Sequence, residues 1–226
     1  MNYFQPNDLN SAFDVLKNNS DLTIAAGCTD LFPITNNMSL DKNILDITNI
    51  KSIKGFQFNS KETKIGSATT WTDIINENLP SCYDMLKACA KEVGSIQIQN
   101  LGTIGGNICN ASPAADSIPC LLALDAKLEL SSANNQRIIP IDEFILGSRK
   151  TKLEQGEILT SIIIPKEKEN GSSSFRKIGA RKYLVISISM VACRILISNN
   201  IIEDIFISVG SCSCLLYTSP SPRDFE

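Results

Sequence analysis

The sequence predicts an α+β protein, and three observations support this class. Short apolar segments with helical and strand periodicity alternate through residues 1–165. A charged stretch rich in glycine and serine follows at 166–174, and the residues after it are rich in β-branched side chains. We therefore expect a boundary near residues 166–171, with a mixed helix–strand part before it and a strand-rich part after it.

The first expected helix spans residues 7–18, where apolar side chains repeat at helical spacing after a capping Asn7 or Asp8. Other helices are expected at 30–34, 71–75, 82–93 and 118–126, and strands at 22–25, 43–47, 53–58, 63–66, 127–130, 137–140, 157–165, 175–178 and 201–209. A short turn is expected at 142–145 and an exposed loop at 150–156. Residues 185–198 fit either a helix or a strand, and their β-branched side chains favour the strand.

Composition excludes several classes of protein. The chain has 226 residues, 43% of them hydrophobic, and a net charge of −3, so it has no basic surface excess of the kind that binds nucleic acid. No apolar run approaches the roughly 20 residues needed to cross a bilayer. The N-terminus has neither the basic nor the apolar region of an export signal. We therefore expect a cytoplasmic protein.

The side-chain inventory limits the chemistry further. The sequence contains no histidine, which removes Ser-His-Asp and Cys-His catalysis and every histidine-containing metal site. Its eight cysteines form no CxxC pair and no iron–sulfur spacing. We expect no catalytic side chain and no metal site in this chain, so redox work would require a bound organic cofactor.

A glycine-rich stretch supplies the strongest sign of a ligand. Gly102, Gly105 and Gly106 fall within five residues, with Thr103 between them and Asn107 directly after. Glycine permits positive φ and close backbone approach, and consecutive amides in such a turn can converge on an anion. A phosphate or diphosphate with hydroxyl groups beside it would suit this loop. The alternative is a plain glycine-rich turn between packed elements, and the polar residues 112–116 that follow favour a ligand.

Several motifs together resemble the medium, FAD-binding subunit of the xanthine dehydrogenase family of molybdenum hydroxylases. In order, they are residues 26–30, 65–70, 97–100, 102–108, 112–116 and 157–159, and the resemblance covers residues 1–213. It implies an FAD-binding PCMH-type fold, shared with vanillyl-alcohol oxidase, at 1–165 with two subdomains at about 1–55 and 56–165. It also implies the start of a CO-dehydrogenase-flavoprotein-like C-terminal domain at 172–213, which breaks off early. Residues 214–226 differ in composition and are expected to be foreign to the fold.

The resemblance implies a flavoprotein that transfers electrons. A 2Fe-2S subunit and a molybdopterin-binding large subunit would be its partners, and FAD would pass electrons from the 2Fe-2S clusters to NAD or another acceptor. Carried over residue by residue, the cofactor contacts are Thr23, Ile24, Ala25, Ala26, Gly27, Cys28, Thr29, Asp30, Gly102, Thr103, Ile104, Gly105, Gly106, Asn107, Ser112, Asp116, Ile158 and Lys182. Backbone amides of 23–30 and 103–107 would hold the diphosphate from opposite sides. Cys28 departs from the family, which usually has glycine there.

Two other functions stay open at this point. One is a stand-alone FAD-dependent oxidoreductase of the same fold, against which the lack of histidine and of a paired acid and base counts. The other is a non-catalytic remnant that has lost FAD, which flavin retention by the purified protein would exclude.

Overall fold

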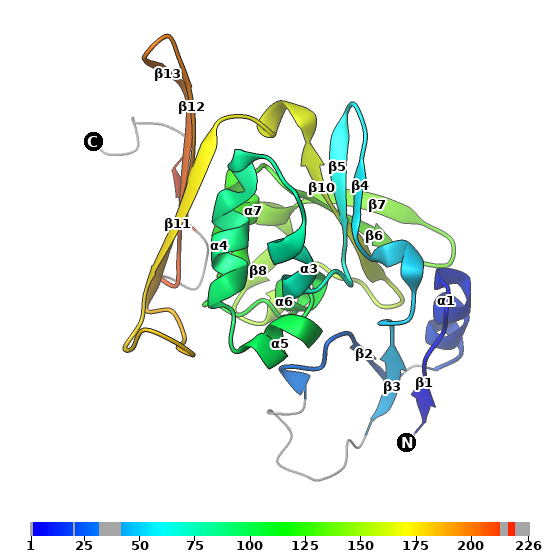
Figure 1. Ribbon diagram of the computed structural model, residues 1–226. Coiled ribbons are helices and arrows are strands. Elements are labelled where there is room, and N and C mark those ends of the chain that lie inside the picture. Colours follow the sequence, from blue (N-terminus) through cyan, green and yellow to red (C-terminus); the bar gives the residue numbers. More distant parts are fainter. Residues whose placement is uncertain (1, 20, 32–41, 213–216, 220–226) are drawn as a thin grey trace.

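The structure is a computed structural model that describes residues 2–19, 21–31, 42–212 and 217–219. These residues form three larger sheets and one two-stranded sheet, with helices between and beside them (Figure 1). No helix in this described part of the chain is long and apolar enough to cross a bilayer.

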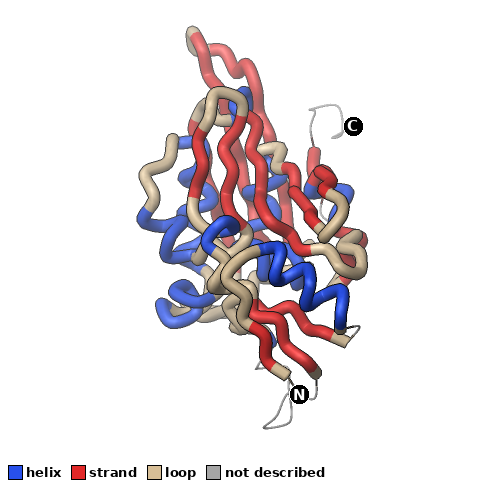
Figure 2. Tube along the Cα trace, turned by 90° about the vertical axis from the view of Figure 1, so that its right-hand side faces the viewer, coloured by secondary structure: helices blue, strands red, loops and turns tan. Residues whose placement is uncertain are grey.

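The N-terminal part is a small parallel sheet with one helix beside it. Its strands lie in the order β1 (Tyr3–Phe4), β3 (Asn43–Asp46) and β2 (Leu22–Ala25). Helix α1 (Leu9–Asn18) begins after Asp8, whose carboxylate accepts a hydrogen bond from the Ser11 amide at 3.0 Å. The helix lies beside the small sheet (Figure 2). Ala12 and Phe13 of α1 belong to a small core that also includes Leu45 of β3.

The central part is built on five antiparallel strands. Their order is β4 (Phe56–Phe58), β5 (Glu62–Gly66), β10 (Ile158–Pro165), β6 (Lys127–Ser131) and β7 (Gln136–Pro140). The middle strand, β10, is buried along its whole length, which is why its sequence is nearly continuously apolar.

Short helices cover this central sheet. They are α3 (Trp71–Asn76), α4 (Asp84–Glu92), α5 (Ile96–Leu101), α6 (Ile104–Asn110), α7 (Ser117–Ala123) and α8 (Ile141–Phe144). Single 3₁₀ turns η1 (Lys51–Ile53), η2 (Ser81–Tyr83) and η3 (Lys166–Lys168) and the strand pair β8 (Ile145–Gly147) and β9 (Lys150–Thr151) complete the part. Trp71, Leu86 and Phe144 belong to the large core that the helices and the sheet share.

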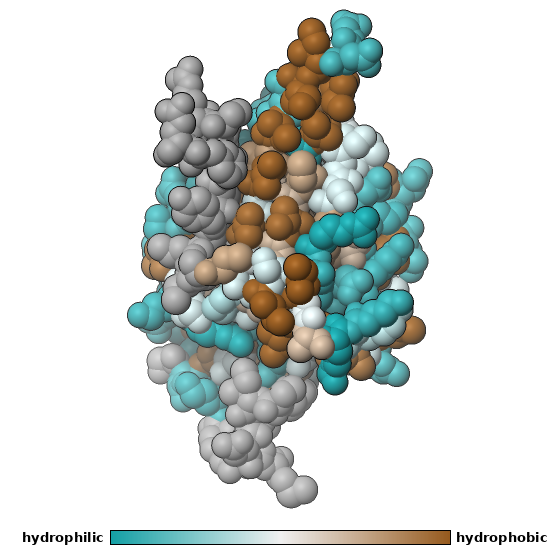
Figure 3. Space-filling model, turned by 90° about the vertical axis from the view of Figure 1, so that its left-hand side faces the viewer, coloured by the Kyte–Doolittle hydropathy of each residue, from teal (hydrophilic) through white to brown (hydrophobic). Residues whose placement is uncertain are grey.

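The C-terminal strands form a separate antiparallel sheet. Its order is β11 (Ser172–Ile178), β12 (Ser189–Ser198), β13 (Ile201–Gly210) and β14 (Tyr217–Ser219), and α4 and α7 lie between it and the central sheet (Figure 1). Ala192 and Arg194 are two residues apart in β12 and therefore both lie on its buried face. The Arg194 guanidinium donates to the Ala123 carbonyl at 2.9 Å. The outer face exposes apolar side chains such as Val191 and Ile197 along these strands (Figure 3).

The glycine-rich stretch is not the open loop that the sequence predicts. Residues 96–110 form α5 and α6, whose N-termini are capped by the hydroxyls of Ser95 and Thr103. Gly105 and Gly106 lie in the first turn of α6, and none of the three glycines of this stretch has a positive φ. An unusual backbone conformation is therefore not the reason for glycine at these positions.

Other differences are smaller. Residues 189–198 are a strand, as preferred for 185–198, whereas residues 185–188 lie outside it. Of the expected turn at 142–145, the first three residues belong to α8 and Ile145 begins β8. Tyr217–Ser219, expected to lie outside the fold, pair with β13 as β14. The expected helix at 30–34 lies outside the described residues beyond Leu31.

Candidate functional site

A cavity of about 660 Å³, here called the central cavity, lies between the N-terminal part and α6. Its lining comes from β2, the turn 26–30, α6, the start of β10 and residues 185–187. The volume is typical of small-molecule sites, which span roughly 300–1,000 Å³. Apolar side chains such as Ile24 and Leu159 share the lining with backbone and side-chain polar groups.

Packing and backbone conformation explain which residues occupy the turn 26–30. A Cβ added to Gly27 would lie 1.8 Å from the Leu101 carbonyl oxygen at the end of α5, so only glycine fits there. Cys28 has a φ of 57°, a left-handed conformation that glycine adopts more readily. The amides of residues 27–30 donate to no acceptor within the described residues. The turn therefore presents several backbone donors at the cavity wall.

The amides at the start of α6 already have acceptors in the protein. Those of Ile104, Gly105, Gly106 and Asn107 donate to the Thr69 carbonyl, the Ser67 carbonyl, the Thr103 hydroxyl and the Thr103 carbonyl at 3.0, 2.8, 3.1 and 3.0 Å, respectively. A Cβ at Gly105 would lie 2.7 Å from the Ser67 carbonyl oxygen, so this glycine lets α6 pack on the end of β5. A Cβ at Gly106 would face the Ala26 Cβ at 3.8 Å. Helix α6 therefore offers a ligand the open space beside Gly106 and some of its side chains. Its first amides are instead used in hydrogen bonds within the protein.

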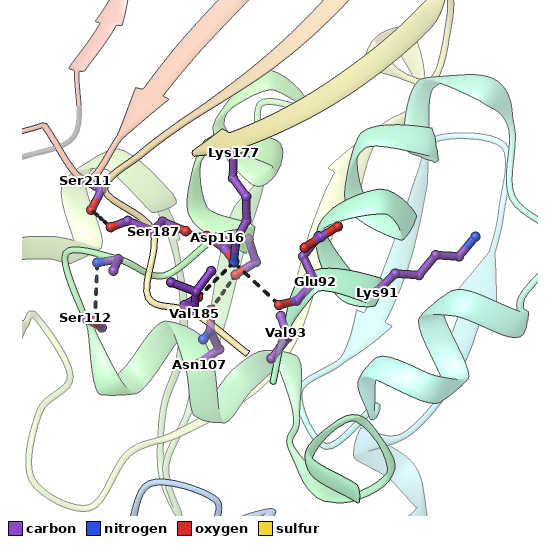
Figure 4. A network of polar contacts seen from close by, with 12 residues as sticks. Lys91, Glu92, Val93, Asn107, Ser112, Asp116, Lys177, Val185, Ser187 and Ser211 are labelled. Carbon is purple, nitrogen blue, oxygen red and sulfur yellow. Dashed lines mark hydrogen bonds and ion pairs between the residues drawn. The ribbon is translucent and has the colours of Figure 1, made fainter. Parts of the chain in front are cut away.

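A buried ion pair occupies another part of the cavity wall (Figure 4). Asp116 accepts hydrogen bonds from Lys177 Nζ at 2.7 Å and from the Ser187 hydroxyl. Lys177 Nζ also donates to the carbonyls of Val185 and Glu92 at 3.3 and 3.5 Å. The side chains of Asp116 and Lys177 are only 7% and 8% exposed, and their hydrogen bonds offset the cost of burying both charges. The pair joins the start of α7 to β11 and to residues 185–187.

A comparison with protein families identifies the domain that contains this cavity. The family model for the FAD binding domain in molybdopterin dehydrogenase matches residues 1–167. The chain belongs to this family. The resemblance inferred from the motifs is thereby confirmed for this FAD-binding domain.

Known relatives and a solved structure support this family assignment. The xanthine dehydrogenase FAD-binding subunit of Escherichia coli O157:H7 is 32% identical over 212 residues, which cover 92% of this chain and 73% of that protein. The nicotinate dehydrogenase FAD-subunit of Eubacterium barkeri is 34% identical over 195 residues, covering 82% of this chain and 65% of that protein. A solved carbon monoxide dehydrogenase of Hydrogenophaga pseudoflava, which lacks the Mo-pyranopterin moiety, matches with a TM-score of 0.86 and 25% identity over 96% of this chain and 77% of that one. These matches confirm the predicted α+β fold and an oxidoreductase component.

The structure brings most of the predicted cofactor contacts of the FAD-binding domain to one place. The central cavity is lined by Ile24, Ala25, Ala26, Gly27, Cys28, Thr29, Asp30, Gly102, Thr103, Gly105, Gly106, Asn107, Ser112, Asp116 and Ile158. Thr23, Ile104 and Lys182 are not part of this lining. Thr23 alternates with Ile24 along β2, and Ile104 is fully buried in the core. Lys182 is exposed, with its ammonium 5.3 Å from the centre of the Tyr183 ring.

Six polar residues of the lining were not predicted from the sequence: Ser67, Glu92, Asn110, Arg149, Lys177 and Ser187. Lys177 follows Phe175 by two residues in β11, so strand alternation places both on the buried face. That alternation is a signal from which Lys177 could have been found. Arg149 lies in a polar segment without periodicity and carries no such signal.

The reactive side chains of the cavity are not suited to catalysis. Burial raises the pKa of the Cys109 thiol to about 12. Burial, and after it the charge of Asp46, raises the pKa of Cys28. Both thiols are therefore neutral near pH 7 and poor nucleophiles. The described residues also hold no group of three or more potential metal ligands.

The residues present fit FAD. A diphosphate requires donors, which the amides of residues 27–30 supply without giving up other described acceptors. Asn107 and Ser112 add polar side chains to the lining, and Ile158 adds apolar surface. Gly106 leaves open the space that a side chain would fill between α6 and Ala26.

Proposed function

We propose that this chain binds FAD in the central cavity and relays electrons as the FAD-binding subunit of a molybdopterin dehydrogenase. A 2Fe-2S subunit would supply the electrons, a molybdopterin-binding large subunit would oxidise the organic substrate, and NAD⁺ or another carrier would accept the electrons. One observation carries this proposal: a row of amide donors at residues 27–30 lines a cavity in a member of this family.

The chain's own residues would bind and orient the cofactor. The amides of residues 27–30 would hold the diphosphate, and the glycine at 106 would let it approach the backbone of α6. Asn107 and Ser112 would meet the sugar and ribityl hydroxyls. The Lys177–Asp116 pair would keep the wall beside them in place. Bound FAD would supply the electron-carrying chemistry, for which no side chain here is suited.

Two titrations test the binding step. FAD added to the purified chain should be bound stoichiometrically, measured by the quenching of flavin fluorescence. Riboflavin, which lacks the diphosphate and the adenosine, should bind at least about a hundredfold more weakly because it cannot use the amides of the turn 26–30. Equal affinity for the two flavins, or no binding of FAD, would refute this assignment.

The relay step needs the partner subunits. In the assembled complex under anaerobic conditions, chemically reduced 2Fe-2S clusters should transfer electrons to the flavin, which is followed by loss of its visible absorbance. Addition of NAD⁺ should then restore the absorbance with formation of NADH. A flavin that stays oxidised beside reduced clusters would refute the relay. A flavin that stays reduced after NAD⁺ is added would assign the final step to a different acceptor.

A further inference from the structure

Three polar side chains on the exposed part of the central cavity form a connected chain. Asn110 Nδ2 donates to the Asp30 carboxylate, and the Arg149 guanidinium donates to Asn110 Oδ1 and, at 3.4 Å, to the Asn110 carbonyl. The guanidinium also lies 3.9 Å from the Asp30 carboxylate. Asp30 belongs to the turn 26–30, Asn110 ends α6, and Arg149 lies between β8 and β9. The chain therefore links three segments that are distant in sequence.

The backbone of Arg149 is held in an uncommon conformation at this point. Its φ is 58°, and its amide donates to the carbonyl of Ala111 at 2.8 Å. Ala111, the residue directly after α6, has a positive φ of 44° itself. Strained non-glycine residues persist where the surroundings over-determine them, and they cluster at binding sites. The contact anchors Arg149 to the end of α6 and places its guanidinium at Asn110 and Asp30.

The turn 26–30 depends on such a link. Its amides at 27–30 have no described acceptor, so the backbone ladder of β2 stops holding the chain after Ala25. Within the described residues, the turn is held by the packing of Gly27 on the Leu101 carbonyl, by the hydrogen bond from the Cys28 thiol to the Ala26 carbonyl, and by the side-chain link at Asp30. The other cation of the cavity, Lys177, is engaged by Asp116 and cannot reach this link as well.

We propose that Arg149 is a positioning residue for the cofactor: through Asn110 and Asp30 it fixes the turn 26–30 against α6, so that the amides of the turn face the central cavity. The inference rests on the proposed function in one respect, namely that the ligand of these amides is FAD. The order of the turn depends on Arg149 whether or not FAD is added, which allows the two ideas to be tested separately.

The first measurement uses the protein without added FAD. Backbone order parameters from ¹⁵N relaxation should be near 0.85 for residues 27–30 and should fall below about 0.6 in Arg149→Ala. The matched control is Arg176→Ala, which removes an exposed arginine from β11. The melting temperature of Arg149→Ala should stay within about 2 °C of the unsubstituted protein, since the side chain is half exposed. Unchanged order parameters in Arg149→Ala would overturn the proposal.

The second measurement is the dissociation constant for FAD. Arg149→Ala should raise it roughly tenfold, and Arg176→Ala should leave it unchanged. The exchange Asp30→Arg with Arg149→Asp should return it to within about threefold, because the Asn110 amide can turn over and serve both partners with its ends reversed. If Arg149→Ala binds FAD more weakly and the exchange does not restore the affinity, then Arg149 contacts FAD itself, which would overturn a positioning role. Failure of the unsubstituted chain to bind FAD would refute the proposed function, and the order parameters would still decide the role of Arg149.

Discussion

Replacement of Gly106 by valine tests the close approach between α6 and the cofactor. A Cβ at this position would lie 2.9 Å from Thr103 Oγ1 and 3.8 Å from the Ala26 Cβ, and the valine methyl groups would extend further into the space between α6 and the turn. A ligand displaced from the turn 26–30 would lose at least two amide–diphosphate hydrogen bonds, each worth about 1.5–3 kcal/mol. The expected loss of about 3 kcal/mol or more corresponds to at least a hundredfold rise in the dissociation constant for FAD.

The fold should survive this change. Valine has a better helix propensity than glycine by a few tenths of a kcal/mol, while the crowded Thr103 cap costs about 1 kcal/mol. The melting temperature should therefore fall by only about 2–4 °C. Flavin fluorescence titration gives the affinity, and Gly106→Ala should show a smaller loss. Unchanged FAD affinity in Gly106→Val would remove Gly106 from the site, whereas a collapse of the melting temperature would show that the glycine serves packing.

Three further predictions concern stability, each measured by urea unfolding. Cys28→Gly should raise the free energy of unfolding by about 0.5–1 kcal/mol, because relief of the left-handed backbone outweighs the added flexibility of the unfolded chain; a decrease would show that the thiol packing matters more. Lys177→Met should lower it by about 3–5 kcal/mol by leaving the buried Asp116 carboxylate unpaired, and adding Asp116→Asn should recover part of the loss; no recovery would contradict the ion-pair account. Hydrogen bonds from Arg137 hold the pKa of Glu157 below its usual value, so this stabilisation is present above the unfolded pKa of about 4.3 and is lost as the pH falls through the folded pKa. Glu157→Gln should therefore flatten the loss of stability below about pH 4.5, and an unchanged acid profile would count against the pair.

Much of the architecture follows from local patterns. The helical repeat of 7–18 predicts α1 with its Asp8 cap, and the apolar run at 157–165 predicts the buried strand β10. The order of several short motifs identifies the family, because each motif alone is common and their combination is rare. The start of α6 was less predictable, since the sequence shows the glycines and Thr103 but not that Thr103 caps a helix containing Gly105 and Gly106.

The division of roles between the two glycine-containing segments could not be predicted. Both 26–30 and 103–107 look like anion-binding turns in the sequence, yet in the second the amides of Ile104 and Gly105 donate to the carbonyls of Thr69 and Ser67. Those acceptors are distant in sequence and reach α6 only through the tertiary packing of the helix on the end of β5. Lys182 illustrates a different limit: strand alternation with Phe175 marks Lys177 as inward-facing, whereas Lys182 lies in a loop, where no periodicity shows that it is exposed.

The central claim is that backbone amides of residues 27–30, and no reactive side chain, hold the diphosphate of FAD. A crystal structure of the chain with FAD tests it most directly. The account predicts diphosphate oxygens within about 2.7–3.2 Å of at least two of these amide nitrogens. A diphosphate bound away from the turn 26–30, with these amides bonded to protein or solvent instead, would contradict it.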